Sequence, residues 1–365
     1  MKILVVNPGS TSTKVSVFED LEEIFTDSVF HDAPYILGFG DVNGQTPMRK
    51  AVTLDLMNKH GLKMSDIDVI IGRGGCAHTQ RAGVTSVSKA LYDDTWNEVG
   101  GNDHASKLGV LCAYEFSQEF GIPAFTLNPT NIDELCDEAR ITGIKGVYRK
   151  AQSHALNQKA TVEQAARDLG LDISSTRFVC AHIDGGTTIG AHLGGRMIDC
   201  TEGAGGDGPL CPTRVGSVPV LEVASYLEEG HSTLDLRKLC SRSGGFASHF
   251  GTSDAKLVHK MMEDGDEHAT LVWKAMCYQT AKAIGEMACV LEGKVNAIIL
   301  TGGLVRYQDV VDYMKQHCGW IAPFVLYPGE LEQQAFARAA YEVATGQCKA
   351  NTYVPEDVFK GFSWS

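Results

Sequence analysis

The chain has 365 residues, enough for two domains, and its 44% hydrophobic and 21% charged residues are typical of a globular protein. No apolar run reaches the roughly 18 residues of a membrane span, and the N-terminal strand-like run leads into a glycine turn with no cleavage site, so we expect a soluble, cytoplasmic protein that does not bind membranes. A net charge of −13 disfavours nucleic acid as a partner, and the absence of any Cys-x-x-Cys pair disfavours structural zinc.

The chain opens with a predicted β-hairpin. Ile3–Val6 is an apolar, β-branched run, and Val15–Phe18 alternates as a second strand. Between them lies the turn Asn7–Lys14, whose backbone N–H groups and hydroxyls can converge on an anion, with Lys14 adding a mobile positive charge. The Walker pattern is absent, so this is not a P-loop. By itself the segment favours an ordinary polar turn over a phosphate site.

Further strands and helices alternate along the chain, which predicts an α/β fold. The predicted strands are Asp68–Ile71, Pro123–Leu127, Arg177–Ile183, Ile189–Leu193 and Asn296–Leu300. The predicted helices are Asp103–Phe120, His268–Leu291 and Leu331–Thr345.

A second strand–turn–strand repeats the design of the first. The turn Asp184–Thr188 contains two glycines, which allow close backbone approach to a phosphate, and Asp184 offers a carboxylate for a magnesium-bound water. A third glycine pair ends a strand at Thr301–Gly303. The repeat predicts two similar domains that face a central cleft, with phosphate hairpins and an adenosine loop as in actin-like (ribonuclease H-like) ATPases and sugar kinases.

No low-complexity linker separates the two halves, and the boundary is expected near residue 150. The sequence therefore predicts an N-terminal domain over 1–150, completed by the C-terminal helix at 331–350. A nucleotide-binding domain is expected over 151–330.

The motifs are colinear with those of a known family. The turn Asn7–Lys14 resembles the opening signature of the acetate and butyrate kinase family, and Gly72–Gly75 in its short form and Asp207–Arg214 resemble the butyrate branch. Other matching segments are His154–Ala160, His182–His192, Gly251–Asp254, Thr301–Gly303 and Tyr327–Glu330. The resemblance spans residues 3 to about 345.

The resemblance implies an enzyme that transfers the γ-phosphoryl group of ATP directly to a short carboxylic acid, reversibly, with magnesium. It also implies assembly into homo-oligomers. The catalytic groups would be Arg73, Asp133, His182 and Arg214. The phosphate-binding residues would be Asn7, Gly9, Ser10, Thr11, Ser12, Lys14, Asp184, Gly185, Gly186, Thr187 and Thr188. The nucleotide would contact Thr252, Asp254, Lys256, Thr301, Gly302 and Gly303, and magnesium would be held near Asp133, Asp184 and Glu330, partly through water.

Each assigned side chain also has a structural interpretation. Arg73 is compatible with a surface turn, Arg214 with a structural ion pair and His182 with a satisfied core histidine. Asp133 is compatible with a helix cap and His154 with packing or capping. For Glu330 and Glu332 a solvated helix start is the preferred expectation.

Two positions depart from the family pattern. Asp184 stands where the family usually has glycine, and it can alter magnesium geometry or repel phosphate. Lys256 stands where the family often has an arginine beside the adenine, and lysine stacks less well on a ring.

The leading interpretation is a kinase for a short acid near four carbons, with branched acids, propionate and acetate as alternatives. A second interpretation is an actin-like nucleotide-binding module without transfer chemistry, supported only by Asp184 and Lys256. A third, an actin-like phosphatase, fits Asp207–Arg214 poorly.

Overall fold

The structure, a computed structural model, describes residues 1–101 and 104–364. It contains two compact units, Met1–Asp133 with Leu331–Ser365, and Glu134–Glu330. The sequence places the division near residue 150, whereas residues 134–150 pack with the second unit. There the Cys136 N–H donates to the Ile198 carbonyl at 2.8 Å, and Arg149 pairs with Asp199 and Asp207 at 2.9 Å.

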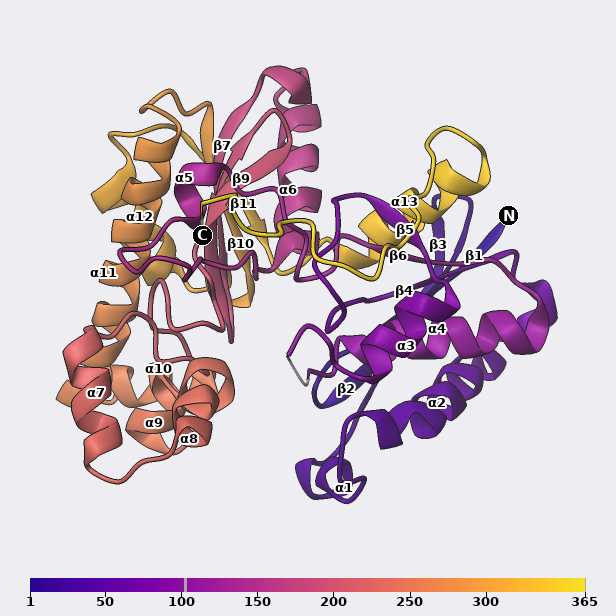
Figure 1. Ribbon diagram of the computed structural model, residues 1–365, viewed down its shortest axis with the longest axis horizontal. Helices are drawn as coiled ribbons and strands as arrows, with labels where there is room; N and C mark the ends of the chain where they lie inside the picture. The colour runs from indigo at the N-terminus through magenta and orange to yellow at the C-terminus, as the bar shows by residue number, and fades with distance from the viewer. Residues whose placement is uncertain (102–103, 365) are drawn as a thin grey trace. The chain divides into compact units, whose positions relative to one another are not determined.

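The first unit is built on a six-stranded sheet in the order β3-β2-β1-β4-β6-β5 (Figure 1). The strands are β1 Lys2–Pro8, β2 Ser12–Glu19, β3 Glu22–Phe30, β4 Val69–Gly72, β5 Val84–Ser86 and β6 Ala124–Leu127. The helices are α1 Ala33–Leu37, α2 Thr46–Lys59, α3 Lys89–Trp96, α4 Lys107–Phe120 and α13 Glu332–Ala344. The predicted helix from Asp103 begins only at Lys107, and Asp103 itself lies outside the described residues.

Strand β1 is buried on both of its faces. Leu4 and Val6 join a core with Met57 of α2 and Phe116 of α4. Because successive strand residues point to opposite faces, Ile3 and Val5 face the other side, where α13 packs on β1 and β4. The C-terminal helix therefore completes the N-terminal sheet.

The second unit is built on a five-stranded sheet in the order β11-β10-β7-β8-β9. Its strands are β7 Arg177–Ile183, β8 Thr187–Leu193, β9 Arg196–Cys200, β10 Ala297–Gly302 and β11 Phe324–Pro328. Its helices are α5 Asp137–Arg140, α6 Ala155–Asp168, α7 Val220–Glu228, α8 Thr233–Lys238, α9 Phe246–Phe250, α10 Ala255–Glu263, α11 Glu267–Val290 and α12 Gln308–Cys318.

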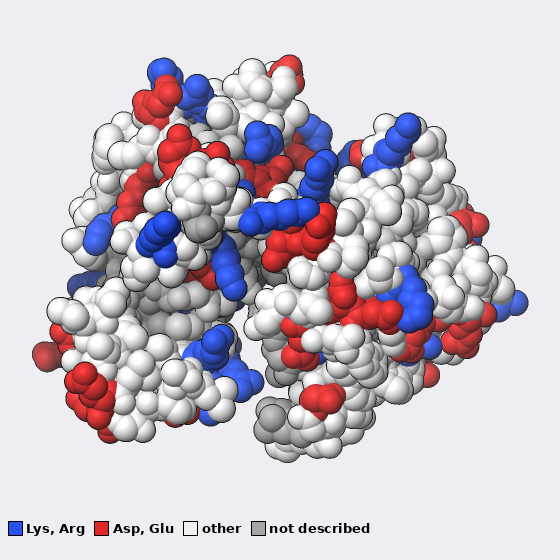
Figure 2. Space-filling model, viewed as in Figure 1, with Lys and Arg blue, Asp and Glu red and all other residues white. Residues whose placement is uncertain are grey.

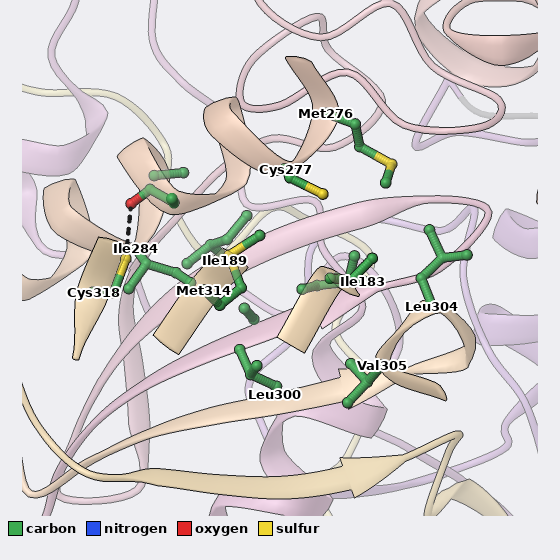
Figure 3. Packing of buried hydrophobic residues seen from close by; sticks show 14 of the residues in the cluster. Ile183, Ile189, Met276, Cys277, Ile284, Leu300, Leu304, Val305, Met314 and Cys318 are labelled. Atoms are coloured by element: carbon green, nitrogen blue, oxygen red, sulfur yellow. Dashed lines mark hydrogen bonds between the residues drawn. The ribbon is translucent and has the colours of Figure 1, made fainter. Parts of the chain in front are cut away.

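Helices cover both faces of this sheet. Ile183, Ile189 and Leu300 point toward α11 and α12, and the Cys318 thiol of α12 contacts the Ala281 carbonyl of α11 at 3.4 Å (Figure 3). On the opposite face, α6 packs Val162 and its neighbours against Phe178 and Ile299 (Figure 1). The apolar run of β7 is thus explained by burial on two sides.

The two sheets share one strand plan. In the first unit β1 pairs antiparallel with β2 and parallel with β4, and in the second unit β7 pairs antiparallel with β8 and parallel with β10. The flanking pairs β2–β3 and β8–β9 are antiparallel, whereas β4–β6 and β10–β11 are parallel. The predicted α/β fold of two similar actin-like units is confirmed.

The surface carries no simple charge pattern on the face in view. Figure 2 shows acidic and basic side chains interspersed over each unit. With a net charge of −13, an anionic ligand must therefore be held by individually placed donors. None of the helices in the described ranges combines the length and apolar character that a membrane span requires.

The role of α13 can be tested at Phe336, which is fully buried on this helix. Phe336→Ala should lower the free energy of unfolding by about 3–5 kcal/mol, because it leaves a cavity against the sheet. Phe30→Ala is the matched control, since Phe30 of the same unit is 82% exposed. Urea denaturation measures both, and equal stabilities for the two variants would contradict the placement of α13.

Candidate functional site

In the first unit, the end of β1 is tied to the start of α13. The amide of Asn7 donates to the Glu332 carboxylate at 2.8 Å and to Gln333 Oε1 at 2.9 Å. Gln333 in turn donates to Ser16 of β2 at 2.5 Å. Glu332 is buried, so the solvated helix start expected for it is wrong: its carboxylate is needed to accept from Asn7.

Arg73 extends from the end of β4 toward the same residues. Its Nη1 lies 3.4 Å from Asn7 Oδ1 and 3.4 Å from the Glu332 carboxylate, and 20% of its side chain is exposed. Arg73 is therefore drawn back against β1 and is not a free surface side chain. Both contacts are long, so a better-placed anion can compete for the guanidinium.

The glycine turn itself presents hydroxyl groups. Ser10 and Thr11 are exposed at its tip, and the Gly9 N–H closes the turn on the Ser12 carbonyl at 2.8 Å. Lys14 lies directly opposite Asn7 in the β1–β2 register. These positions suit an anion site above the turn.

The turn is supported by Arg49 of α2, which lies in no motif recognised in the sequence. Arg49 is fully buried and donates to the carbonyls of Ser12 at 2.6 Å, Gly9 at 3.2 Å and Ser10 at 3.3 Å. One guanidinium thus satisfies three carbonyls of one turn, which fixes its shape from the side opposite to the tip. Burial lowers the pKa of Arg49 to about 10, so it stays charged at neutral pH.

Arg49 belongs to a small buried network. It also donates to Thr13 Oγ1 at 2.9 Å and to Gln45 Oε1 at 2.9 Å, and Thr13 contacts His31 Nε2 at 2.8 Å. Burial, and then the charge of Arg49, lower the pKa of His31. The first turn is therefore held by side chains from three segments.

In the second unit, the guanidinium of Arg214, from the loop after β9, lies against the turn of the second hairpin. A Cβ atom on Gly186 would come 2.6 Å from Arg214 Cζ, and one on Gly203 would come 2.4 Å from Nη1. The missing side chain of Gly186 therefore makes room for this guanidinium. Thr213 fixes the arginine's own turn by donating its N–H and hydroxyl to the Gly185 carbonyl at 3.0 and 2.7 Å.

Arg214 has no ion pair within the described part of the chain. Its Nε is buried without a hydrogen-bond partner there, and burial lowers its pKa. The structural ion pair considered for Arg214 is therefore wrong. The Thr187 hydroxyl of the same hairpin is also buried without a partner among the described residues. Two buried polar groups, one on the hairpin and one on the loop that carries Arg214, are thus without a partner in the described chain.

Thr188 of this hairpin contacts a pair of stacked histidines, His154 and His182. The Thr188 hydroxyl contacts His154 Nδ1 at 2.9 Å and accepts from Gln158 Nε2 at 2.9 Å. His154 stacks on His182 with ring centroids 4.1 Å apart and planes 19° apart. His182 is 2% exposed at the end of β7 and contacts Asn157 of α6 at 2.9 Å.

Asp184 joins the second hairpin to the third glycine turn. Its carboxylate accepts from the Gly185 N–H at 2.7 Å and from the Gly303 N–H at 2.5 Å. Gly302 has φ of +100°, and a Cβ there would meet the Ile183 carbonyl at 2.3 Å. Asp184, which departs from the family pattern, therefore has its carboxylate bound by two backbone N–H groups and connects the two turns.

One cluster in this unit offers metal ligands. His182, Asp184 and Glu330 each place one ligand atom within 4.8 Å of the others. Two carboxylates suit Mg²⁺, which prefers oxygen ligands and keeps several waters, whereas the imidazole does not. Asp133, the third predicted metal residue, is buried in the first unit. It lies three residues before Cys136, the N-cap of the following helix α5, so it does not cap that helix.

The remaining predicted nucleotide contacts lie at α10 and β10. Thr252 accepts from the Asp254 N–H at 3.1 Å, and Asp254 caps α10 by accepting from the Lys256 N–H at 2.9 Å. Lys256 is exposed on the first turn of that helix. Thr301 is fully buried and donates to the Gly329 carbonyl at 2.9 Å, so its hydroxyl is already used inside the unit.

The support of the first turn by Arg49 can be tested without a ligand. Arg49→Lys should speed amide hydrogen exchange of residues 9–13 about tenfold or more, because lysine cannot serve several carbonyls at once. Arg81→Lys, at an exposed arginine of the same unit, is the control. Mass-spectrometric exchange measures both, and unchanged protection in Arg49→Lys would show that Arg49 does not hold the turn.

Comparison with known proteins finds one family model and several solved structures that match this chain. The acetokinase family model matches residues 143–317. Solved structures with a similar fold include Porphyromonas gingivalis acetate kinase, at TM-score 0.77 and 18% identity over 94% of this chain and 99% of that one. A Francisella tularensis propionate kinase has TM-score 0.71 and 16% identity over 93% and 98%, and Entamoeba histolytica acetate kinase has TM-score 0.71 and 12% identity over 92% and 97%. The sequence of residues 143–317 thus matches the acetokinase family model, and the chain shares its fold over nearly its whole length with these kinases.

Proposed function

We propose that this protein is an ATP-dependent kinase that phosphorylates the carboxylate of a short-chain fatty acid. Butanoate and ATP would give butanoyl phosphate and ADP, reversibly. The observation that carries the proposal is Arg214, a guanidinium enclosed by Gly186 and Gly203 with no carboxylate partner in the described chain. An enclosed cation without a partner is costly, and a bound phosphoryl group would remove that cost.

The reaction places few covalent demands on the protein. A carboxylate oxygen attacks the γ-phosphorus, the bond to the β–γ bridging oxygen breaks, and ADP leaves with those electrons. Catalysis of such a step consists of positioning and charge neutralisation. Arg214 offers a planar fork of donors to the equatorial oxygens, and Thr187 offers an unused hydroxyl beside it.

The first unit supplies the acceptor side in this proposal. Arg73 is held by two long contacts and would exchange them for the substrate carboxylate. Ser10 and Thr11, on the turn fixed by Arg49, would contact phosphate oxygens. Asp133 would lie on the metal side, as the family resemblance implies.

The residues present fit a magnesium ion. Asp184 and Glu330 would hold it, in part through water, and the ion would neutralise charge on the nucleotide phosphates. Because Asp184 already accepts two backbone N–H groups, its carboxylate is fixed in place and a bound water is the simpler contact.

A nucleotide-binding module without transfer chemistry is the alternative, and Lys256 is the feature that favours it. Lys256 is exposed, so its side chain is free to reach a ring, but it offers a point charge where arginine would stack. Calorimetry that shows ATP binding, with no acyl phosphate formed from any acid, would favour this alternative.

The acid specificity can be measured by hydroxamate trapping with ATP and magnesium. Straight and branched acids of two to five carbons should give product, with the best kcat/KM near four carbons. One methylene in an apolar pocket changes binding by only about 1–3 kcal/mol, so neighbouring acids should remain substrates. If none of these acids gives an acyl phosphate at high enzyme concentration, the proposal is disproved. If acetate gives the highest kcat/KM, the preferred substrate is acetate and not butanoate.

The role of Arg214 can be tested through its glycine neighbour. Gly186→Ala should lower kcat on the order of 100-fold, because the new methyl group displaces a donor to the transferred phosphoryl group. Gly143→Ala is the matched control, since a Cβ at Gly143 of the same unit meets nothing within 4 Å and Gly143 is not among the predicted phosphate-binding residues.

Steady-state kinetics on both variants, with circular dichroism to check folding, decides the question. Equal rates for Gly186→Ala and Gly143→Ala would contradict the assignment of Arg214 to the reacting phosphate.

A further inference from the structure

A chain of hydrogen bonds leads from the backbone at Gly329 to the ring of His182. The Gly329 carbonyl lies 2.9 Å from the Thr301 hydroxyl, which lies 3.0 Å from Asn157 Nδ2. Asn157 Nδ2 lies 2.9 Å from His182 Nδ1. All four residues belong to the second unit, and Asn157, His182 and Thr301 are fully or almost fully buried.

The direction of each bond in this chain follows from its first member. A carbonyl can only accept, so the Thr301 hydroxyl donates its single hydrogen to the Gly329 carbonyl. Thr301 must then accept from Asn157, which requires the NH₂ group of the amide on that side. The second hydrogen of the same NH₂ group points to His182 Nδ1, which must accept it.

The opposite amide orientation is unfavourable. It would place the Asn157 oxygen against Thr301, whose hydrogen would have to leave Gly329. Two oxygens would then face each other at 2.9 Å without a hydrogen between them. The relay therefore selects one orientation of Asn157.

We propose that Asn157 is a positioning residue that fixes the tautomer of His182 with its hydrogen on Nε2. The inference rests on the proposed function for its catalytic meaning: Nε2–H donates to an oxygen of the transferred phosphoryl group. The His154 ring, stacked 4.1 Å away, keeps the plane of the donor constant. The same tautomer has no lone pair on Nε2, so the nearby Asp184 and Glu330, and not His182, are left to hold magnesium.

The neighbouring residue on α6 provides an internal reference. Gln158 Nε2 donates to Thr188, so its Oε1 faces His192 Nε2 at 3.0 Å and requires a hydrogen there. Burial lowers the pKa of His192 to about 3, so this ring is neutral at neutral pH. His192 should therefore show the Nε2–H tautomer in the wild type and in every Asn157 variant.

The test is long-range proton–nitrogen correlation NMR of the ¹⁵N-labelled full chain at neutral pH, without ligand. The imidazole signals of His182 are identified as those that disappear from the spectrum of the His182→Gln variant. Its Nε2 should carry the hydrogen and its Nδ1 should not. A hydrogen on Nδ1 in the wild type overturns the proposal, whether or not the protein proves to be a kinase.

Asn157→Asp adds a second reading of the same spectrum. A carboxylate can only accept, so the His182 hydrogen should appear on Nδ1 while His192 stays unchanged. In the acyl phosphate assay kcat should fall on the order of 100-fold, as for loss of one donor, with a smaller change in the KM for ATP.

Thr161→Val is the matched control, since it removes a buried hydroxyl that donates to the backbone of Asn157 on the same helix. Its His182 tautomer and kcat should stay as in the wild type. A His182 that keeps Nε2–H in Asn157→Asp would refute the positioning role. If that variant does not fold, the wild-type spectrum alone decides. A normal tautomer without acyl phosphate formation would count against the proposed function only.

Discussion

The guanidinium of Arg214 imposes the strongest constraint on the second unit. It is enclosed by Gly186 and Gly203, its turn is tied to Gly185 by Thr213, and no carboxylate in the described chain balances it. A buried cation without a partner is unfavourable. In the proposed function a phosphoryl group would balance its charge. Residues 143–317, which include Arg214, match the acetokinase family model.

Both units solve the same problem at the end of their first strand. Asn7, the next-to-last residue of β1, is bound by Glu332 and Gln333 at the start of α13. His182, the next-to-last residue of β7, is bound by Asn157 in the first turn of α6. In each case a polar side chain that the proposed function places beside the ligand is oriented by residues of a helix. Duplication of the strand plan thus brings duplication of its support.

The features that depend on short stretches of sequence were predicted correctly. The two hairpins, the glycine turns and the long helix α11 follow from strand alternation, turn chemistry and helical spacing, and these were recognisable along the chain. The two-unit plan followed because one design recurred.

The supporting side chains were not predictable in this way. Arg49 reaches a turn some forty residues away, and Asn157 contacts Thr301 at a separation of 144 residues, so neither lies in a motif. Glu332 was read as solvated because its sequence context is polar, whereas the helix that carries it covers β1. The contact between Gly186 and Arg214 was not predictable, because Arg214 lies beyond the hairpin in the sequence.

The central claim is direct transfer between ATP and a carboxylate. Phosphorus NMR on a mixture of the protein, ATP, magnesium and ¹⁸O-labelled butanoate tests it most directly. Direct transfer predicts equal amounts of ADP and an acyl phosphate whose bridging oxygen carries the label. The appearance of AMP and pyrophosphate, or of ADP and inorganic phosphate with no acyl phosphate, would contradict it.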